Sequence, residues 1–536
     1  MATPIPDLLS SAPTRRLDAR KTGEALTFAF AQGVADDTWD DLLAAARLPE
    51  TRFRPEGYAR DLFVAELVAS CAVVEVDGTT RLLGKRWLER LLSHPPEDAE
   101  TVTLRRDVLR ELDGSPSMRT ELEGLYGRLR FLRDQLGITP GRGSDVLRRR
   151  LEILATVRGA IDAMAEAFAG ARSALTRVSE WAAAVRASEA WRALLELLDY
   201  DEHLATVDVR VRVGADGRVR GLVLADVREN AASRFARTPI GRWLARIALV
   251  FRGYRFDAEE LMARAIEQVF DGMQDVLVAS MQLAGDLELY LAAFAFRARA
   301  ERAGLAVCLP ELGATRALTR LFNPLLLPHE KRVVPCELHA DRPDRVVLVT
   351  GPNSGGKTRL LQAIGLTQLL GQCGFFVPAA SATIRSVDGM FVSFGQAPAA
   401  DATEGRLGTE LLRVRALFET ICVGGMVLVD ELCSGTNPSE GEELFRHVVD
   451  LLAQLSPQAF LSTHFLTLAA DLERAPPNDR MDFLQVELDA HGVPTYGFVP
   501  GVAKTSLAHQ TAARLGVTRD DLAALVQRAV NAAKRS

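Results

Sequence analysis

The chain has 536 residues, of which 48% are hydrophobic and 25% are charged, and its formal net charge is -6. This length accommodates roughly three or four domains, and the composition is that of an ordinary soluble globular protein. The negative charge argues against a surface coated with nucleic-acid-binding residues, and no uncharged apolar run approaches the roughly 18 residues of a membrane span. The N-terminus lacks the layout of a signal peptide. The six cysteines form no C-x-x-C pair, so we expect reduced thiols in a cytoplasmic protein.

The first quarter of the chain is predicted to be mainly helical after a short lead-in. Residues 1–55 contain several prolines and carry no functional signal. From Asp61 to Leu136 the apolar pattern is mostly helical, with breaks around Asp77-Gly78 and Pro95-Pro96.

Two regions of long helix are expected next in the chain. One or two long helices are predicted between Ser144 and Asp199, and a further long helix is predicted from Asp257 to Ala303. The apolar stripe of the first region consists of Leu154, Val157, Ile161, Met164 and Phe168.

A strictly alternating segment lies between these helical regions. Val207–Val213 alternates as a half-buried strand, residues 214–217 read as a turn, and Arg218–Asp226 read as a second strand. The stretch from Thr206 to Phe256 holds eleven arginines and four acidic residues, an excess of seven positive charges. The predicted hairpin is therefore either a solvated sheet face or an arginine ladder that meets phosphate groups.

From Val333 to Gly501 the pattern changes to alternating strands and helices. Short apolar strands are predicted at Val346–Val349, Met426–Val429 and Ala459–Leu461. This alternation favours a mostly parallel sheet flanked by helices.

Residues 351–358 read GPNSGGKT and fit the phosphate-binding loop pattern G-x-x-x-x-G-K-[ST]. A predicted buried strand precedes the loop and a predicted helix follows it, so backbone N–H groups and the positive helix end would face phosphates. Lys357 is expected to reach the β- and γ-phosphates, and the Thr358 hydroxyl is expected to bind Mg²⁺. The nucleotide-binding residues are predicted to be Gly351, Pro352, Asn353, Ser354, Gly355, Gly356, Lys357 and Thr358.

Two further polar elements follow predicted strands. Asp430 and Glu431 end the strand at Met426–Val429, and phosphoryl chemistry needs one carboxylate for the metal and one group that activates or orients water. We assign Asp430 to the metal and Glu431 to the water. His464 follows the strand at Ala459–Leu461 and is expected to sense the γ-phosphate.

These motifs resemble those of the MutS family of DNA-repair ATPases. The likeness rests on GPNSGGKT at 351–358, DELCSGTNPSEG at 430–441 and STH at 462–464, and it extends more weakly over residues 60–515. It implies a fold of class α + α/β, with an all-α core, long lever helices and a small β-hairpin insertion, followed by an ABC-type P-loop NTPase domain. It also implies ATP and Mg²⁺ as cofactors and a homodimer through the ATPase domain.

The resemblance also implies roles for individual residues. Lys357, Glu431 and His464 would be catalytic, while Thr358 and Asp430 would hold the metal. The hairpin would lie where the family has its DNA clamp, which makes candidate phosphate contacts of Arg210, Arg212, Arg218 and Arg220.

The resemblance predicts six divisions of the chain. They are an N-terminal segment (1–55), a helical core with the first lever helix (56–205), the arginine-rich clamp-like region (206–256), the returning lever helix (257–320), the ATPase domain (321–515) and a helical tail (516–536).

Three features set this chain apart from longer members of the family. Too few residues precede the core for the mismatch-recognition and connector domains, and the sequence stops at Ser536, so a C-terminal Smr nuclease is not expected. The loop that acts on the partner's nucleotide usually reads S-T-F; here the nearest match is Gly405-Arg406-Leu407, which makes Arg406 and Glu410 the candidates for that contact.

The leading hypothesis is a dimeric clamp ATPase that acts in DNA repair on mismatched, branched or recombination-intermediate DNA. The alternative is a ribosome- or RNA-associated ATPase of the short MutS branch, because an arginine hairpin would fit RNA phosphates equally well. A third hypothesis is a nucleotide-gated assembly protein without a nucleic-acid role.

Overall fold

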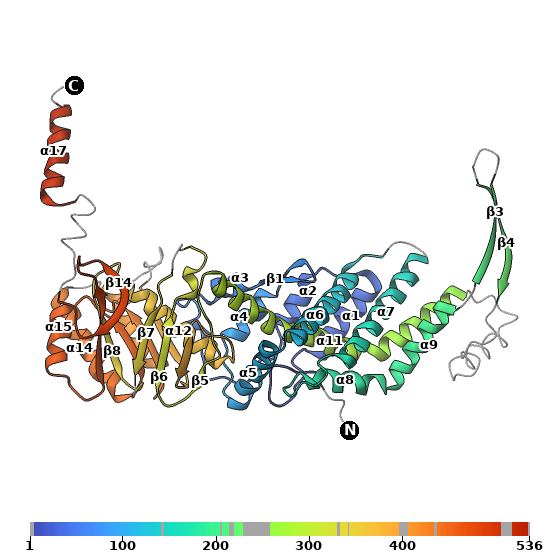
Figure 1. Cartoon of the computed structure of the whole chain (residues 1–536), viewed down its shortest axis with the longest axis horizontal. Helices are drawn as coiled ribbons and strands as arrows, with labels where there is room; N and C mark the ends of the chain where they lie inside the picture. The colour runs from blue at the N-terminus through green and yellow to red at the C-terminus, as the bar shows by residue number, and fades with distance from the viewer. Residues whose placement is uncertain are drawn as a thin grey trace. The chain divides into compact units, whose positions relative to one another are not determined.

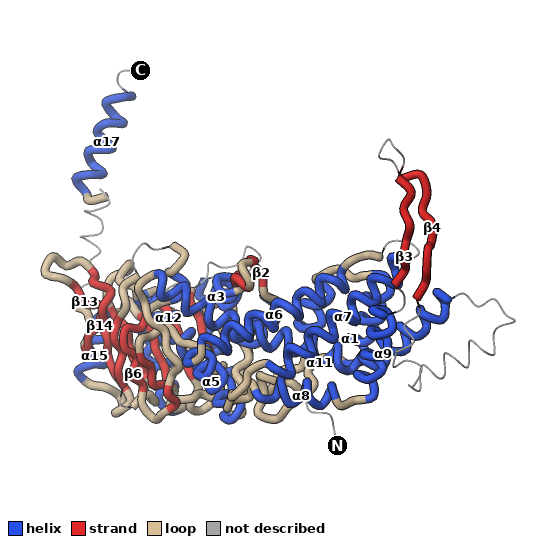
Figure 2. Tube along the Cα trace, turned by 45° about the vertical axis from the view of Figure 1, so that its right-hand side comes forward, coloured by secondary structure: helices blue, strands red, loops and turns tan. Residues whose placement is uncertain are grey.

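The fold is given by a computed structural model, shown in Figure 1. It describes residues 5–140, 144–203, 206–213, 219–228, 258–329, 333–340, 342–395, 406–433, 437–504 and 517–533. The chain divides into two compact units, one formed by 1–48, 74–87 and 107–291 and the other by 49–73, 88–106 and 292–536. Figure 2 shows that the first unit is mainly helical, whereas most strands belong to the second.

The helices of the first unit follow the predicted order, with more breaks than expected. They are α1 (Ala19–Gln32), α2 (Asp37–Ala44), α6 (Pro116–Gly137), α7 (Ser144–Glu166), α8 (Thr176–Arg186) and α9 (Glu189–His203). Three helices, α4 (Lys85–Leu92), α5 (Ala99–Gly114) and α11 (Ala258–Arg302), contribute residues to both units.

The break predicted at Asp77-Gly78 is the turn of a β-hairpin, so the expectation of helix on both sides is wrong there. β1 (Val73–Val76) pairs with β2 (Thr79–Leu82). Asp77 and Gly78 both have positive φ, at 49° and 70°. This combination matches the right-handed twist of the flanking strands and closes a two-residue hairpin.

The region from Ser144 to Asp199 contains parts of three helices instead of one or two. Phe168, which the apolar stripe placed inside a helix, follows α7 with a φ of 58°, and Gly170 has a φ of 82°. Left-handed backbone at these positions ends a helix. The hydroxyl of Ser188 accepts a hydrogen bond from the Trp191 N–H at 3.1 Å, which caps the start of α9.

The long helix predicted from Asp257 to Ala303 is confirmed as α11. Ile266, Val269 and Met273, which recur along it at helical spacing, are buried. By length and composition alone, Met262–Arg302 is apolar enough to cross a membrane, but 94% of its most apolar window is buried inside the protein. A core helix of a soluble protein has these same properties, so this finding is weak evidence for a membrane span.

Two buried carboxylates on α11 hold other parts of the first unit. Asp286 forms a salt bridge with Arg16, and Arg16 forms a second one with Asp7. The Asp286 carboxylate also accepts a hydrogen bond from the Leu8 N–H at 3.0 Å. These contacts give the N-terminal segment, which carried no sequence signal, a structural role: it anchors to α11 through a buried ion network.

Glu288 is the second buried carboxylate, and it should make stability depend on pH. It accepts hydrogen bonds from the Gly84 N–H and the Tyr126 hydroxyl, both at 3.0 Å. Burial, opposed by Arg133 and reinforced by Asp40, raises the pKa of Glu288 from 4.5 to about 7. The folded state therefore binds more protons than the unfolded state between these values, and the free energy of unfolding falls as pH rises through that window.

We expect Glu288→Gln to flatten this decline, which amounts to at most about 1.4 kcal/mol per pH unit for one group. All five tryptophans fall in the ranges 1–48, 74–87 and 107–291 that form the first unit, so intrinsic fluorescence during urea unfolding at pH 5, 6 and 7.5 reports on that unit. The control is Glu152→Gln, at an exposed position on α7. Equal slopes for wild type and Glu288→Gln would contradict the assignment.

The backbone of the predicted arginine-rich segment forms a β-hairpin. β3 (Thr206–Val213) pairs antiparallel with β4 (Val219–Arg228), and the register sets Arg210 opposite Val223 and Arg212 opposite Gly221. Arg220 lies on β4, whereas Arg218 lies outside the described residues.

The second unit contains a six-stranded sheet in the order β10-β11-β12-β8-β13-β14. The first five strands run parallel and β14 is antiparallel to β13. The strands are β8 (Val346–Thr350), β10 (Met390–Phe394), β11 (Met426–Asp430), β12 (Gln458–Ser462), β13 (Met481–Leu488) and β14 (Pro494–Pro500). The three predicted strands are thus confirmed as β8, β11 and β12, within one residue at each end.

Helices cover both faces of this sheet, which explains why the inner strands are apolar throughout. Alternate residues such as Val346 and Val427 join a core with Phe445 and Leu468, which come from α14 (Pro438–Gln454) and α15 (Leu466–Arg474). Helix α12 (Lys357–Gln372) packs on β11 and β12. The predicted α + α/β class therefore agrees with the structure.

Smaller elements complete the second unit. A four-stranded sheet has the order β5-β9-β6-β7, with β5 (Glu311–Leu312), β6 (Arg316–Leu321), β7 (Cys336–Ala340) and β9 (Ser381–Ile384). The other helices within the described residues are η1 (Pro55–Gly57), α3 (Val64–Cys71), η3 (Pro324–Leu326), α13 (Arg406–Thr420) and α17 (Arg519–Ala533).

Candidate functional site

The glycine-rich loop lies at the carboxyl end of β8, between that strand and α12. In open parallel sheets this edge is where ligands bind. Gly351 has a φ of 137°, and a Cβ atom there would lie 2.6 Å from the Val486 side chain. Gly356, with a φ of 89°, is the residue before the first turn of α12. Gly351 is required by its backbone conformation and by the close approach of β13, whereas Gly356 is required by its backbone conformation.

Lys357 begins α12 and turns back over the loop. Its Nζ donates to the carbonyl oxygens of Gly351 at 3.0 Å and Pro352 at 3.2 Å, and it lies 4.0 Å from Glu431 Oε1. Burial lowers the pKa of Lys357, while Glu431 and Asp430 oppose that shift. The ammonium group thus lies between the loop and the acidic pair, where it can meet phosphate oxygens.

Three side chains, from α12, β11 and β12, and the backbone N–H of Glu431 form a connected chain of hydrogen bonds. Thr358 Oγ1 donates to Asp430 Oδ2 at 2.5 Å, and Ser462 Oγ donates to Asp430 Oδ1. The same Ser462 hydroxyl accepts the Glu431 N–H at 3.0 Å. Parallel pairing of β8, β11 and β12 places these strand ends at one edge of the sheet.

Thr358 and Asp430 bring together two oxygen groups of the kind that could hold Mg²⁺. Mg²⁺ prefers oxygen ligands and is bound through one or two carboxylates together with substrate phosphates. A hydroxyl and a carboxylate already lie within hydrogen-bond distance here. No cluster of three acidic, histidine or cysteine ligands occurs among the described residues, and a site completed by phosphate oxygens does not need one.

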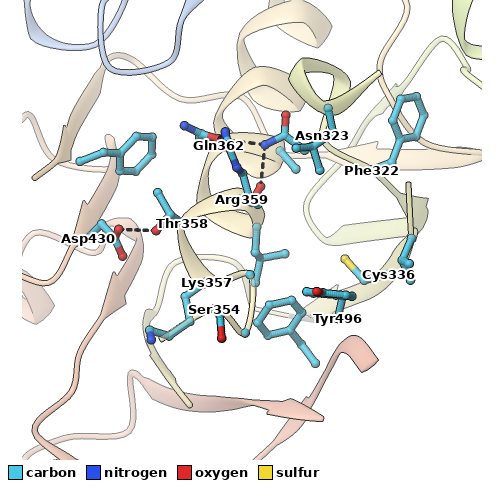
Figure 3. A pocket seen from close by; sticks show the side chains of 18 of the residues that line it. Phe322, Asn323, Cys336, Ser354, Lys357, Thr358, Arg359, Gln362, Asp430 and Tyr496 are labelled. Atoms are coloured by element: carbon cyan, nitrogen blue, oxygen red, sulfur yellow. Dashed lines mark hydrogen bonds between the residues drawn. The ribbon is translucent and has the colours of Figure 1, made fainter. Parts of the chain in front are cut away.

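A pocket of about 740 Å³ joins the loop to the acidic pair. Figure 3 shows Ser354, Lys357 and Thr358 on one part of its lining, with Asp430 facing Thr358. Phe322, Val333, Cys336, Tyr496 and Phe498 also line it. The pocket therefore has a polar end, lined by the glycine-rich loop and the acidic pair, and an apolar part. Its volume lies within the usual range for small-molecule sites.

Every residue of the predicted loop from Pro352 to Thr358 lines this pocket, and so do Asp430 and Glu431. Gly351 takes part through its carbonyl, which accepts from Lys357. His464 is exposed after the end of β12, where its ring packs beside Phe465 with centroids 4.3 Å apart. The described residues that line the pocket do not include it.

Arg406 and Glu410, the two residues expected to contact the partner's nucleotide, both lie on α13. Arg406 is the first residue of α13. Glu410, one turn further, is buried and engaged within its own chain: it accepts the Cys433 N–H at 3.0 Å and pairs with Arg413 at 3.2 Å.

Sequence reasoning assigned no role to several residues that complete the site. Ser462 belonged to a recognised motif, but its link between Asp430 and Glu431 depends on adjacent strands. Asn323 donates to the Arg359 carbonyl at 3.1 Å and to Gln362 Oε1 at 3.0 Å, which ties η3 to α12 (Figure 3). Tyr496 reaches the pocket from β14, more than 130 residues after the loop. Spacing along the chain gives no signal for such contacts.

Comparison with known proteins finds the same domain type. Residues 347–534 match the family described as MutS domain V. The chain is similar to the Endonuclease MutS2 of Thermus thermophilus, with 27% identity over 96% of this chain and 61% of that protein. It is also similar to the Endonuclease MutS2 of Gemmatimonas aurantiaca, with 31% identity over 50% of this chain and 32% of that protein, and to that of Thermomicrobium roseum, with 31% over 38% and 25%. The chain thus spans about three fifths of the first relative's length and smaller parts of the others.

Proposed function

Since this chain belongs to the MutS family and carries that family's ATPase domain, we propose that it hydrolyses ATP and couples hydrolysis to binding of DNA during DNA repair or recombination. The observation that carries the proposal is one pocket containing a phosphate-binding loop, a buried lysine and an acidic pair. Coupling to DNA rests on the family and on the arginine-rich hairpin.

Different residues of the pocket have different roles in ATP hydrolysis. Loop N–H groups and Lys357 bind the phosphate oxygens, while Thr358 and Asp430 would hold Mg²⁺, which neutralises charge on the phosphates when bound. Glu431, whose backbone is held by Ser462, orients the attacking water and accepts its proton. The apolar part of the pocket receives the base and ribose and keeps solvent from the reacting phosphate.

We propose that a second copy of the chain completes the site. Arg406 at the start of α13 would reach the partner's nucleotide, and His464, exposed two residues after β12, would contact the γ-phosphate once the two ATPase domains close. ATP binding would then favour a closed dimer. Under this proposal the dimer holds mismatched, branched or recombination-intermediate DNA.

The hairpin formed by β3 and β4 is the proposed clamp element. Arginine contacts to phosphate supply affinity without reading base sequence, so binding would depend on DNA structure and on salt. The six cysteines are free, which fits the reducing cytoplasm where we propose the protein acts.

A binding panel tests the coupling. Intact duplex, mismatched duplex, a four-way junction and structured RNA are titrated with the protein, each with and without ATP, and binding is followed by fluorescence anisotropy. We expect ATP-dependent preference for a junction or mismatch over intact duplex. Preference for RNA, together with co-sedimentation with ribosomes, would instead support the RNA-associated alternative.

Neutralising the hairpin should weaken DNA binding. Replacing Arg210, Arg212, Arg218 and Arg220 together by Gln is expected to lower affinity at least tenfold and to reduce the slope of log K against log salt by up to about three to four, because each lost phosphate contact removes roughly 0.9.

A charge-matched variant controls for the loss of four positive charges. Arg20, Arg148, Arg415 and Arg474 are all more than 70% exposed, and their joint replacement by Gln removes the same charge elsewhere. If both quadruple variants reduced affinity and slope equally, the hairpin would not be the contact surface.

A further inference from the structure

The turn that carries the proposed water-orienting residue is conformationally strained. Glu431 and Cys433 both have positive φ, at 48° and 63°. Non-glycine residues adopt this region at a cost, and such strain persists only where surrounding contacts hold it. The contacts that hold this turn therefore determine where the Glu431 carboxylate points.

Two side chains anchor the backbone of the turn from opposite ends. The Ser462 hydroxyl accepts the Glu431 N–H, and Glu410 Oε2 accepts the Cys433 N–H, both at 3.0 Å. Cys433 is fully buried, and burial, with Glu410 adding to the effect, raises the pKa of its thiol to about 12. The Cys433 N–H has no access to water, so loss of its acceptor would leave a buried donor unpaired.

A second layer of contacts holds Glu410 itself. Its carboxylate pairs with Arg413 Nη1 at 3.2 Å. Arg413 in turn donates from Nε to Ser393 Oγ at 2.8 Å and from Nη2 to the Ser393 carbonyl at 3.2 Å. Ser393 lies on β10, the strand beside β11. The Glu410 side chain is thus fixed against the sheet.

We infer that Glu410 is a positioning residue for ATP hydrolysis, which holds the strained turn in the conformation that aims Glu431 at the attacking water. This inference rests on the proposed function. Among the described residues, Glu410 pairs with Cys433 and Arg413, and it does not belong to the lining of the nucleotide pocket. It lies one turn after Arg406 on α13, so a contact made by Arg406 with a partner would act on the same helix that holds the turn.

Two neutral substitutions of similar size separate the effect of losing the hydrogen-bond acceptor at position 410 from the effects of losing its charge or its volume. Glu410→Gln keeps an oxygen for the Cys433 N–H, whereas Glu410→Met removes it. We expect Glu410→Met to lower kcat on the order of 10- to 100-fold, as loss of outer-shell partners commonly does, with the Kd for ATP within about twofold of wild type. Glu410→Gln should stay within about threefold of wild-type kcat.

Glu419→Met is the matched control, because Glu419 lies on the same helix with its side chain 58% exposed. It should leave kcat, the Kd for ATP and the melting temperature unchanged. Wild-type kcat in Glu410→Met would overturn the inference, and so would equal losses in the Gln and Met variants or a loss of ATP affinity as large as the loss of kcat.

The test also distinguishes the inference from the function on which it rests. If wild type hydrolyses ATP, Lys357→Ala does not, and Glu410→Met is fully active, the proposed function stands and the positioning role of Glu410 fails. If Lys357→Ala retains turnover, the proposed function itself fails.

Discussion

Lys357→Ala is expected to lose ATP hydrolysis by at least about 10²–10³-fold, the effect of removing one charged or hydrogen-bonding group from a preorganised site. Lys357 is the buried cation between the loop carbonyls and Glu431. Without it, the negative charge of the triphosphate would face Glu431 and Asp430 directly, so ATP affinity should fall as well. Phosphate release at saturating and subsaturating ATP measures both effects.

Lys85→Ala is the control for this substitution, since Lys85 is exposed on α4. It should keep wild-type turnover and ATP affinity. A Lys357→Ala protein with an unchanged melting temperature and unchanged ATP turnover would show that the glycine-rich loop is not the hydrolytic site.

Glu431→Gln is expected to separate ATP binding from hydrolysis. The loop, Lys357 and Thr358 remain in place, so the Kd for ATP should change little, while kcat falls by about 10²–10⁴-fold because the proton acceptor is lost. The long-lived ATP state should then accumulate as a dimer. Single-turnover hydrolysis and light scattering after size-exclusion chromatography, with and without ATP, measure the two effects.

Glu443→Gln provides the comparison for this second substitution. Glu443 is 77% exposed on α14, and its replacement should change neither kcat nor the ATP-dependent mass. A Glu431→Gln protein that remains monomeric with ATP and turns over at the wild-type rate would refute both the role of Glu431 and the proposed closure.

The parts of the site that consist of residues adjacent in the chain could be predicted from the local sequence pattern. The strand, turn and helix around residues 351–358 form one continuous segment, and Gly351 and Gly356 adopt the positive φ angles that favour glycine. The acidic pair was predictable because an apolar strand of a covered parallel sheet ends in two carboxylates. The long helix α11 was predictable because its apolar stripe repeats over many turns.

Other elements depended on features that periodicity does not report. The helical pattern before residue 137 hid the hairpin of β1 and β2, because short strands with a two-residue turn fit a helical stripe about as well. The stripe through Phe168 continued past the real end of α7, where left-handed backbone stops the helix. Positive φ at a non-glycine residue leaves no mark on hydrophobic spacing.

The nucleotide loop, the acidic pair and the α/β character of the second unit could be read from the amino-acid order, because each depends on residues adjacent in the chain. The distant groups that complete them become apparent in the folded chain. Ser462 bridges Asp430 and Glu431 because β11 and β12 are neighbours, and Glu410 supports the turn because α13 packs against β10. Strand order and helix packing arise from burial of apolar surface over the whole unit, and no local spacing encodes them.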